Sequence, residues 1–191
     1  MKFQVHTKET APEASRATVE ATAKKYGFLP KLFGVLAESP TAVQAYAAIN
    51  KALEQSALSP VEQQVVALTV STTNDCAYCV GAHSTVAQMV RMPEDILAGL
   101  REQRPLSDRK LNALRTLVLS VMRHRGWVPE DDLEHFAAAG YGQRHLLDVL
   151  TIVALKTLSN YLNHIAHTPL DRQFASQTWS PKEGCTSCLT T

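Results

Sequence analysis

The chain has 191 residues, of which 45% are hydrophobic, and its 19 Lys and Arg nearly balance 18 Asp and Glu. No long run of one charge appears, which argues against a nucleic-acid-binding surface or a polybasic membrane anchor. No apolar run approaches the roughly 18–20 residues of a transmembrane helix, and no signal-peptide pattern follows Met1. We therefore expect a cytoplasmic protein without nucleic-acid or membrane partners, in a compartment where thiols are kept reduced.

Helix signals follow one another along the chain, whereas no alternating strand pattern bounded by hairpin signals occurs. Start signals include Pro40 and the sequence Ser59-Pro60-Val61-Glu62, and stop signals include Gly27. The expected helices cover residues 12–26, 41–55, 60–73, 76–91, 93–100, 107–124, 129–139 and 143–164. We predict an all-α fold with one helical domain over residues 1–169, in two halves joined near residue 105. Residues 170–191 lack helical periodicity and are expected to form a poorly ordered tail.

The last expected helix has a long apolar middle. Residues 146–155 are apolar on most sides of this helix, so the segment should be buried at the centre of the protein or at a subunit contact. Because such a wide apolar surface is hard to bury in a small monomer, we expect a homo-oligomer.

Residues 74–83 read Asn-Asp-Cys-Ala-Tyr-Cys-Val-Gly-Ala-His and carry the chemistry of the chain. Asn74 or Asp75 is a suitable N-cap, so a helix should begin beside Cys76. On that helix Cys76, Cys79 and His83 would share one face, with neighbouring Cβ atoms about 5–6 Å apart. A helix N-terminus lowers a thiol pKa from about 8.5 into the range of about 3.5–7.5. His83 can supply a proton, accept one, or stabilise a thiolate as imidazolium.

A disulfide between Cys76 and Cys79 would be strained on a regular helix. A relaxed disulfide needs Cβ atoms about 3.8 Å apart, which is shorter than helical i,i+3 spacing. Strained disulfides are readily reduced, and this suits a catalytic cycle better than a structural bridge.

The apolar helix followed by Asn-x-Cys-x-Tyr-Cys-x-x-x-His resembles the AhpD-like alkylhydroperoxidases of the carboxymuconolactone decarboxylase family. Phe28-Leu29-Pro30, Asn163-His164 and Thr168-Pro169 are similar to its peroxidase-related branch, so the likeness covers most of residues 20–172. The resemblance implies an all-helical fold, self-association and reduction of a hydroperoxide substrate by thiols. We expect an external dithiol to return the electrons and no cofactor to take part.

The resemblance also assigns roles to the residues of the motif. It implies that Cys79 is the peroxidatic thiol, that Cys76 is the resolving thiol and that His83 relays protons beside Cys79. The glutamate that the family carries on the preceding helix is replaced here by Gln64. Glutamine orients a partner by hydrogen bonding but does not titrate.

Two neighbouring positions bear on this assignment. Glu62 lies two residues before Gln64, which at about 100° per residue places it nearly on the opposite helix face. Tyr78 stands between the cysteines, where AhpD has a histidine, and we expect it to orient a proton donor.

Other readings remain open from the residues alone. The two cysteines and His83 could be a buried structural cluster or part of a zinc site, with Cys185 and Cys188 of the tail as further ligands. His164 and His167 could bind metal, although interaction with a helix C-terminus explains them as well. A lactone decarboxylase and a non-enzymatic redox sensor are the alternative functions, of which the first needs no cysteine pair.

Overall fold

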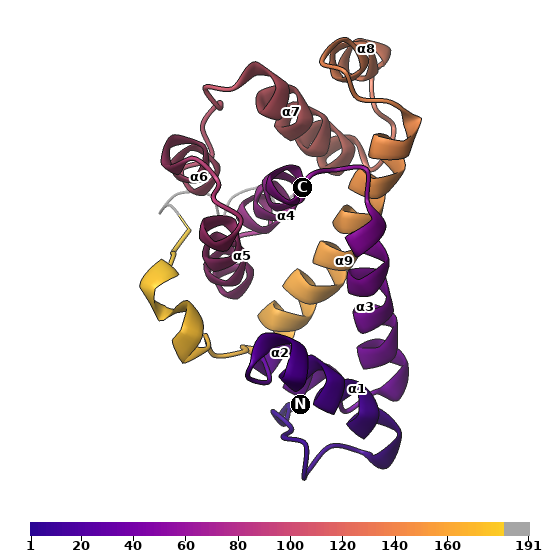
Figure 1. The fold of residues 1–191 in the computed structure, drawn as a ribbon, viewed down its shortest axis with the longest axis vertical. Coiled ribbons are helices and arrows are strands. Elements are labelled where there is room, and N and C mark those ends of the chain that lie inside the picture. The colour runs from indigo at the N-terminus through magenta and orange to yellow at the C-terminus, as the bar shows by residue number, and fades with distance from the viewer. Residues whose placement is uncertain (182–191) are drawn as a thin grey trace.

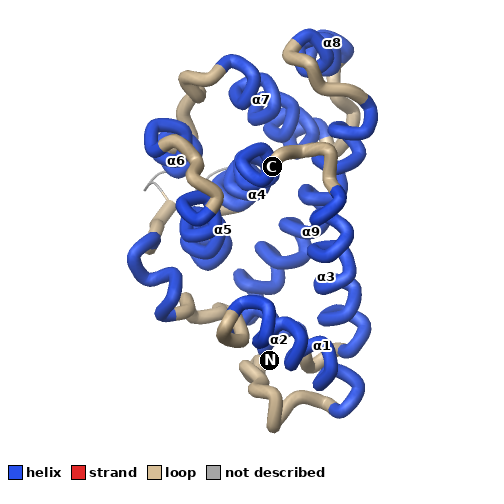
Figure 2. The backbone as a smooth tube through the Cα atoms, viewed as in Figure 1, coloured by secondary structure: helices blue, strands red, loops and turns tan. Residues whose placement is uncertain are grey.

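The computed structural model describes residues 1–181, and within them it contains α-helices and 3-10 helices but no β-strand (Figure 2). The all-α prediction is confirmed. The helices, with their bounds, are α1 (Glu13–Tyr26), α2 (Lys31–Leu36), α3 (Pro40–Ala52), η1 (Leu53–Gln55), α4 (Pro60–Thr73), α5 (Ala77–Met89), α6 (Glu94–Arg101), α7 (Arg109–His124), α8 (Glu130–Ala138), α9 (Gln143–Ala166) and η2 (Arg172–Gln177).

Local signals place most helix ends where the sequence predicts them. The Ser59 hydroxyl accepts from the Glu62 backbone N–H while the Glu62 carboxylate accepts from the Ser59 N–H, which forms a capping box at the start of α4. Gly27 ends α1 with a φ of 77°, which glycine adopts without strain. The helix expected over residues 107–124 begins at Arg109 instead, because Asp108 caps it.

Helix α4 lies at the centre of the fold and contacts α5, α7 and α9 (Figure 1). Its residues from Val65 to Thr72 are all buried, because neighbours surround the helix on most sides. Helices α1, α2 and α3 pack together at one end of the molecule, and α3 also contacts α9. This arrangement brings α4, α5 and α9 around the cysteine motif.

Helix α9 is buried on one face and exposed on the other. Its inward face includes Ile152 and Leu155, which join the hydrophobic core. Its outward face carries an apolar stripe, which we call the α9 stripe. The large members, with their exposed fractions, are Leu147 (63%), Leu150 (41%), Leu158 (39%), Tyr161 (56%) and Ile165 (65%).

The expectation of a poorly ordered tail was wrong for residues 170–181. The η2 segment packs against α5, and the Asp171 side chain is buried. Beyond it, the Trp179 indole N–H donates to the Arg101 carbonyl at 3.0 Å. Cys185 and Cys188 lie outside the described residues. None of the helices in the described part of the chain is both long and apolar enough to cross a membrane.

Candidate active site

The two cysteines of the motif lie at the junction of α4 and α5. Both side chains are 1% exposed and neither is in a disulfide. The expected cap was wrong, because Asn74 ends α4, Asp75 follows in the left-handed region with φ 54°, and Cys76 itself is the N-cap of α5. Cys76 has extended backbone angles (φ −87°, ψ 90°). The distance between its sulfur and that of Cys79 is therefore not set by helical i,i+3 spacing.

Helix α9 supplies polar groups to both sulfurs. The Asn163 side-chain amide donates to Cys79 Sγ at 3.3 Å and lies 3.9 Å from Cys76 Sγ. The Ser159 hydroxyl lies 3.7 Å from Cys79 Sγ. A donor aimed at a sulfur favours its charged form, so the Asn163 amide favours a thiolate at Cys79.

The two thiols differ in acidity. A hydrogen bond from the Cys76 thiol lowers the pKa of Cys79, and the Lys156 charge and the Ser159 hydroxyl lower it further against the opposing effect of burial. The pKa of Cys76 is raised by its hydrogen bond to Cys79 and by burial. The arrangement therefore favours a Cys79 thiolate that accepts a hydrogen bond from a protonated Cys76.

His83 is held at both ring nitrogens. Its Nδ1 lies 2.8 Å from Gln64 Oε1, and its Nε2 lies 2.6 Å from Lys156 Nζ. Because the amide oxygen only accepts and an ammonium only donates, the pairing fixes a neutral imidazole with its proton on Nδ1. Burial and the Lys156 charge hold the pKa of His83 well below its usual value. Of the roles open to His83, stabilising the thiolate as imidazolium does not fit this environment.

Lys156 is a site residue that no motif in the sequence predicted. Its side chain is 2% exposed, and its ammonium also donates to the Tyr46 hydroxyl at 3.2 Å. Burial lowers the pKa of Lys156, but Tyr46 and Cys79 raise it more, and the net shift is upward. The signal available in the sequence was a single lysine at the end of the largely apolar stretch 146–155 on α9.

Glu62 and Tyr78 lie in different surroundings from His83. Glu62 accepts hydrogen bonds from Tyr141 at 2.9 Å and pairs with Lys110 at 3.0 Å, away from His83. The Tyr78 hydroxyl donates to Asp171 Oδ2 at 2.6 Å and accepts from the Leu32 N–H at 3.2 Å. Tyr78 thus joins α5 to α2 and to the segment before η2.

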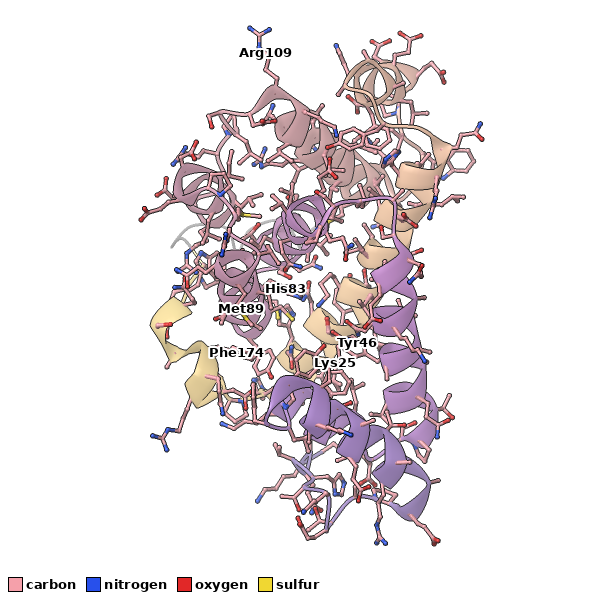
Figure 3. The ribbon with its side chains drawn as sticks, in the orientation of Figure 1. Lys25, Tyr46, His83, Met89, Arg109 and Phe174 are labelled. Carbon is pink, nitrogen blue, oxygen red and sulfur yellow. The ribbon has the colours of Figure 1, made fainter. Side chains whose placement is uncertain are left out.

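Two cavities meet at the Lys156–His83 pair. One, of about 240 Å³, is mainly apolar, and we call it the aromatic cavity. Cys79, His83 and Lys156 contribute to its wall, together with the aromatic residues Tyr26, Phe28, Phe33, Tyr46, Tyr78 and Phe174. Figure 3 shows Tyr46 on the α3 side of this region, His83 and Met89 on α5, and Phe174 on η2. The second, of about 350 Å³, lies on the Gln64 side and shares His83 and Lys156.

Nothing in the described residues marks a metal centre. Within residues 1–181, no three His, Cys, Asp or Glu side chains gather closely enough to hold an ion. His164 and His167 therefore have no third protein ligand there, while Cys185 and Cys188 lie beyond this part of the chain.

Comparisons with known proteins agree with this picture. The model of the carboxymuconolactone decarboxylase family matches residues 40–117, a region that runs from α3 into α7. This region is therefore similar to the carboxymuconolactone decarboxylase family. The match contains Gln64, both cysteines of the motif and His83, whereas Lys156 and Asn163 on α9 lie outside it. A search of curated proteins found no match.

Solved structures share the fold, and some of them are AhpD-like proteins. An uncharacterised peroxidase-related protein from Ralstonia eutropha JMP134, described as an alkylhydroperoxidase AhpD core, is 23% identical with a TM-score of 0.82 and covers 95% of this chain and 97% of its own. A peroxidase-related protein from Silicibacter sp. TM1040 is 20% identical with a TM-score of 0.75, covering 87% and 90%. A cysteine-to-alanine variant of the debrominase Bmp8 in complex with 2,3,4-tribromopyrrole is 11% identical with a TM-score of 0.76, covering 93% and 95%. The resemblance expected from the motif is confirmed.

Proposed function

We propose that this protein is a thiol-dependent hydroperoxide reductase. The observation that carries the proposal is the position of Cys79, whose thiolate-favouring surroundings coincide with the wall of the aromatic cavity. A thiolate is the nucleophilic form of cysteine, and a second thiol beside it can close a disulfide.

The proposed cycle has three steps. The Cys79 thiolate attacks one oxygen of the O–O bond of the hydroperoxide, so that a sulfenic acid forms on Cys79 and the displaced oxygen takes a proton and leaves as an alcohol. The Cys76 thiol then condenses with the sulfenic acid, which forms the disulfide and releases water. An external dithiol finally reduces the disulfide and is itself oxidised.

The cavity indicates the class of hydroperoxide. Its wall is mainly apolar and rich in aromatic rings, and a site of about 240 Å³ holds a compact organic group. We therefore propose an uncharged alkyl or aryl hydroperoxide as the substrate, in preference to hydrogen peroxide. Support for the reaction class comes from the family match and from the AhpD-like fold. The proposal includes a cytoplasmic location and no cofactor.

A turnover assay tests the proposal. Cumene hydroperoxide should be consumed with dithiothreitol as reductant, and with a higher kcat/KM than hydrogen peroxide. The Cys76→Ser variant should trap a sulfenic acid on Cys79, whereas Cys79→Ser should give no oxidised intermediate at low peroxide. No consumption of any hydroperoxide by the wild type would reject the function, and a sulfenic acid on Cys76 would reverse the roles.

Two other outcomes have their own readouts. Activity on a lactone acid that persists in a Cys76→Ala, Cys79→Ala double variant would indicate a decarboxylase. A disulfide that forms with peroxide and changes assembly without turnover would indicate a redox sensor.

Reductive dehalogenation is a second candidate. An apolar cavity beside a thiolate suits a halogenated ring as well as an organic hydroperoxide, and the debrominase Bmp8 shares the fold. Release of bromide from 2,3,4-tribromopyrrole in the presence of dithiothreitol would favour this reaction, and its absence would remove it.

A further inference from the structure

Lys156 is a buried cation for which the proposed cycle has so far given no role. Its side chain is 2% exposed, and within residues 1–181 no carboxylate forms an ion pair with it. The two side chains that accept from its ammonium are the neutral His83 ring and the Tyr46 hydroxyl. A buried charge without a counter-charge is strongly disfavoured, so a negative group is needed nearby.

The register of α5 against α9 indicates which group this is. Lys156 meets His83, Ser159 meets Cys79, and Asn163 meets the Cys76–Cys79 pair, so the two helices run antiparallel with contacts about one turn apart. Lys156 therefore lies about one helical turn along the α5–α9 contact from Ser159, the residue that meets Cys79. Both side chains also line the aromatic cavity.

The ammonium has a hydrogen left for this cavity. A lysine ammonium has three N–H donors, and two of them are directed to His83 and Tyr46. The third is available to the sulfur of Cys79 or to a molecule bound in the cavity. With its Nε2 occupied by Lys156 and its Nδ1 by Gln64, His83 has no proton to offer at this position.

We propose that Lys156 is the cationic partner that holds Cys79 as a thiolate, and that it is the acid that protonates the oxygen displaced from the hydroperoxide. The second half rests on the proposed peroxidase function, whereas the first half does not. His83 and Tyr46 then act as positioning residues that hold the ammonium in the cavity wall.

With Lys156 as the acid, every proton in the proposed cycle is accounted for. When the thiolate sulfur bonds to one peroxide oxygen, the O–O bond breaks and the alkoxide takes a proton from the ammonium, which leaves a neutral amine. The Cys76 thiol and the Cys79 sulfenic acid then give the disulfide and water. Reduction by a dithiol returns both thiols, and the Cys79 proton passes back to the amine, which restores the ion pair.

The other titratable groups around the cavity are less suited to these roles. Tyr46 on α3 and Tyr26 on α1 are phenols, which are neutral when protonated and so give the thiolate no positive charge. Burial raises the pKa of Tyr26. The Tyr78 hydroxyl on α5 is directed to Asp171, which precedes η2. Cys76, the remaining acid, supplies its proton to the second step of the cycle. Lys156 is the cation among these groups.

The first test measures the thiol pKa without any peroxidase assay. The rate of alkylation of Cys79 by iodoacetamide is followed across pH in a Cys76→Ser background, at peptide level, so that Cys185 and Cys188 do not contribute. An opposite charge at close range lowers a pKa by about 1–3 units. Lys156→Met should therefore raise the Cys79 pKa by about 1–3 units, and Lys156→Arg should leave it low.

Two further variants separate charge from folding. Lys156→Gln keeps hydrogen-bond donors for His83 and Tyr46 but no charge, so it should raise the Cys79 pKa even if Lys156→Met does not fold. Lys110→Met removes a lysine that pairs with Glu62 outside the site and should leave the Cys79 pKa unchanged. An unchanged Cys79 pKa in folded Lys156→Gln would overturn the ion pair.

The second test compares two oxidants in single-turnover formation of the sulfenic acid. An alkyl hydroperoxide expels an alkoxide that needs a proton, whereas peracetic acid expels a stable carboxylate. At a pH where Cys79 is ionised in both proteins, Lys156→Gln should slow the reaction with tert-butyl hydroperoxide about 10²–10⁴-fold, which is typical of a lost general acid. The loss with peracetic acid should be much smaller.

Equal losses with both oxidants would overturn the role of Lys156 as the acid. A wild-type protein that reacts with peracetic acid but with no alkyl hydroperoxide would reject the peroxidase function, and the alkylation experiment would still decide the ion pair. The two failures are therefore distinguishable.

Discussion

The Gln64 side-chain oxygen accepts a hydrogen bond from His83 Nδ1 at 2.8 Å, across the contact between α4 and α5. Glutamine thus holds the ring in one tautomer without bringing a charge to it. The family glutamate in the same place would bring a carboxylate to this nitrogen.

Gln64→Glu should raise the pKa of His83, because a nearby negative charge favours the imidazolium. An imidazolium no longer accepts from the Lys156 ammonium at Nε2, so we expect turnover to fall where the ring is charged. Gln64→Ala should keep turnover near that of the wild type, apart from lost packing. The measurement is a pH–rate profile of the three proteins with one hydroperoxide and one dithiol; overlapping profiles for wild type and Gln64→Glu would show that this position takes no part in proton transfer.

Tyr78→Phe should loosen the segment that closes the aromatic cavity. The change removes the bond from the Tyr78 hydroxyl to the buried Asp171 carboxylate, and such a loss costs about 1–3 kcal/mol. Hydrogen exchange in residues 172–177 should become faster and KM for a bulky hydroperoxide should rise. Tyr141→Phe is the matched control, because it removes a similar bond to Glu62 and should leave exchange in residues 172–177 as it is. Unchanged exchange in Tyr78→Phe would contradict this account.

Glu62→Gln should change the acid stability of the protein. The Glu62 pKa is lowered to about 2 from a reference of 4.5, since bonds from the Ser59 backbone, Lys110 and Tyr141 outweigh the opposing effect of burial. A carboxyl with a lowered folded-state pKa stabilises the fold above its unfolded-state pKa, and this contribution disappears as the pH falls through the folded-state value. The wild type should thus lose stability between about pH 4.5 and 2, and Glu62→Gln should lose less over the same range while being less stable at pH 7. Thermal unfolding at several pH values measures both effects, and parallel curves would refute the assignment.

The α9 stripe should be a contact between copies of this chain. Its members, with the exposed Ala154 between them, recur every three or four residues, which is the spacing of helix–helix seams. We expect a homo-oligomer whose mass by light scattering falls to that of a monomer in Leu158→Glu. Trp127→Glu is the control, since Trp127 is 89% exposed away from the stripe. A wild type that is monomeric at micromolar concentration would disprove the contact.

Local signals in the sequence were sufficient for most helices and for part of the site. Prolines, capping serines and glycines placed the helices because they act on their own turn. Gln64 was indicated by the family resemblance, and it meets His83 because α4 and α5 are consecutive helices with a short connection.

The start of α5 was misplaced for a physical reason. Asn74 and Asp75 are better caps than cysteine, but the tight turn after α4 needs a residue that tolerates positive φ, and Asp75 is used there. The cap position therefore passes to Cys76. Capping preferences describe single positions. They do not take into account that the end of one helix and the start of the next need the same residues.

The remaining site residues come from contacts across long stretches of sequence. Lys156 is 73 residues from His83, and Asp171 is 93 residues from Tyr78. No helical period or cap relates such positions, because their proximity depends on how α9 and the segment after it pack. An isolated lysine at the end of a largely apolar stretch was the one local clue.

The extended backbone of Cys76 has a consequence for motion during the cycle. Because only one of the two sulfurs is attached to a residue within the hydrogen-bonded turns of α5, the thiols can approach one another by rotation at the loop residue while the helix stays intact. The oxidised and reduced forms should therefore differ by a local adjustment of residues 74–76, and Cys79 and His83 keep their helical spacing throughout. Such a cycle needs no refolding step between one substrate molecule and the next.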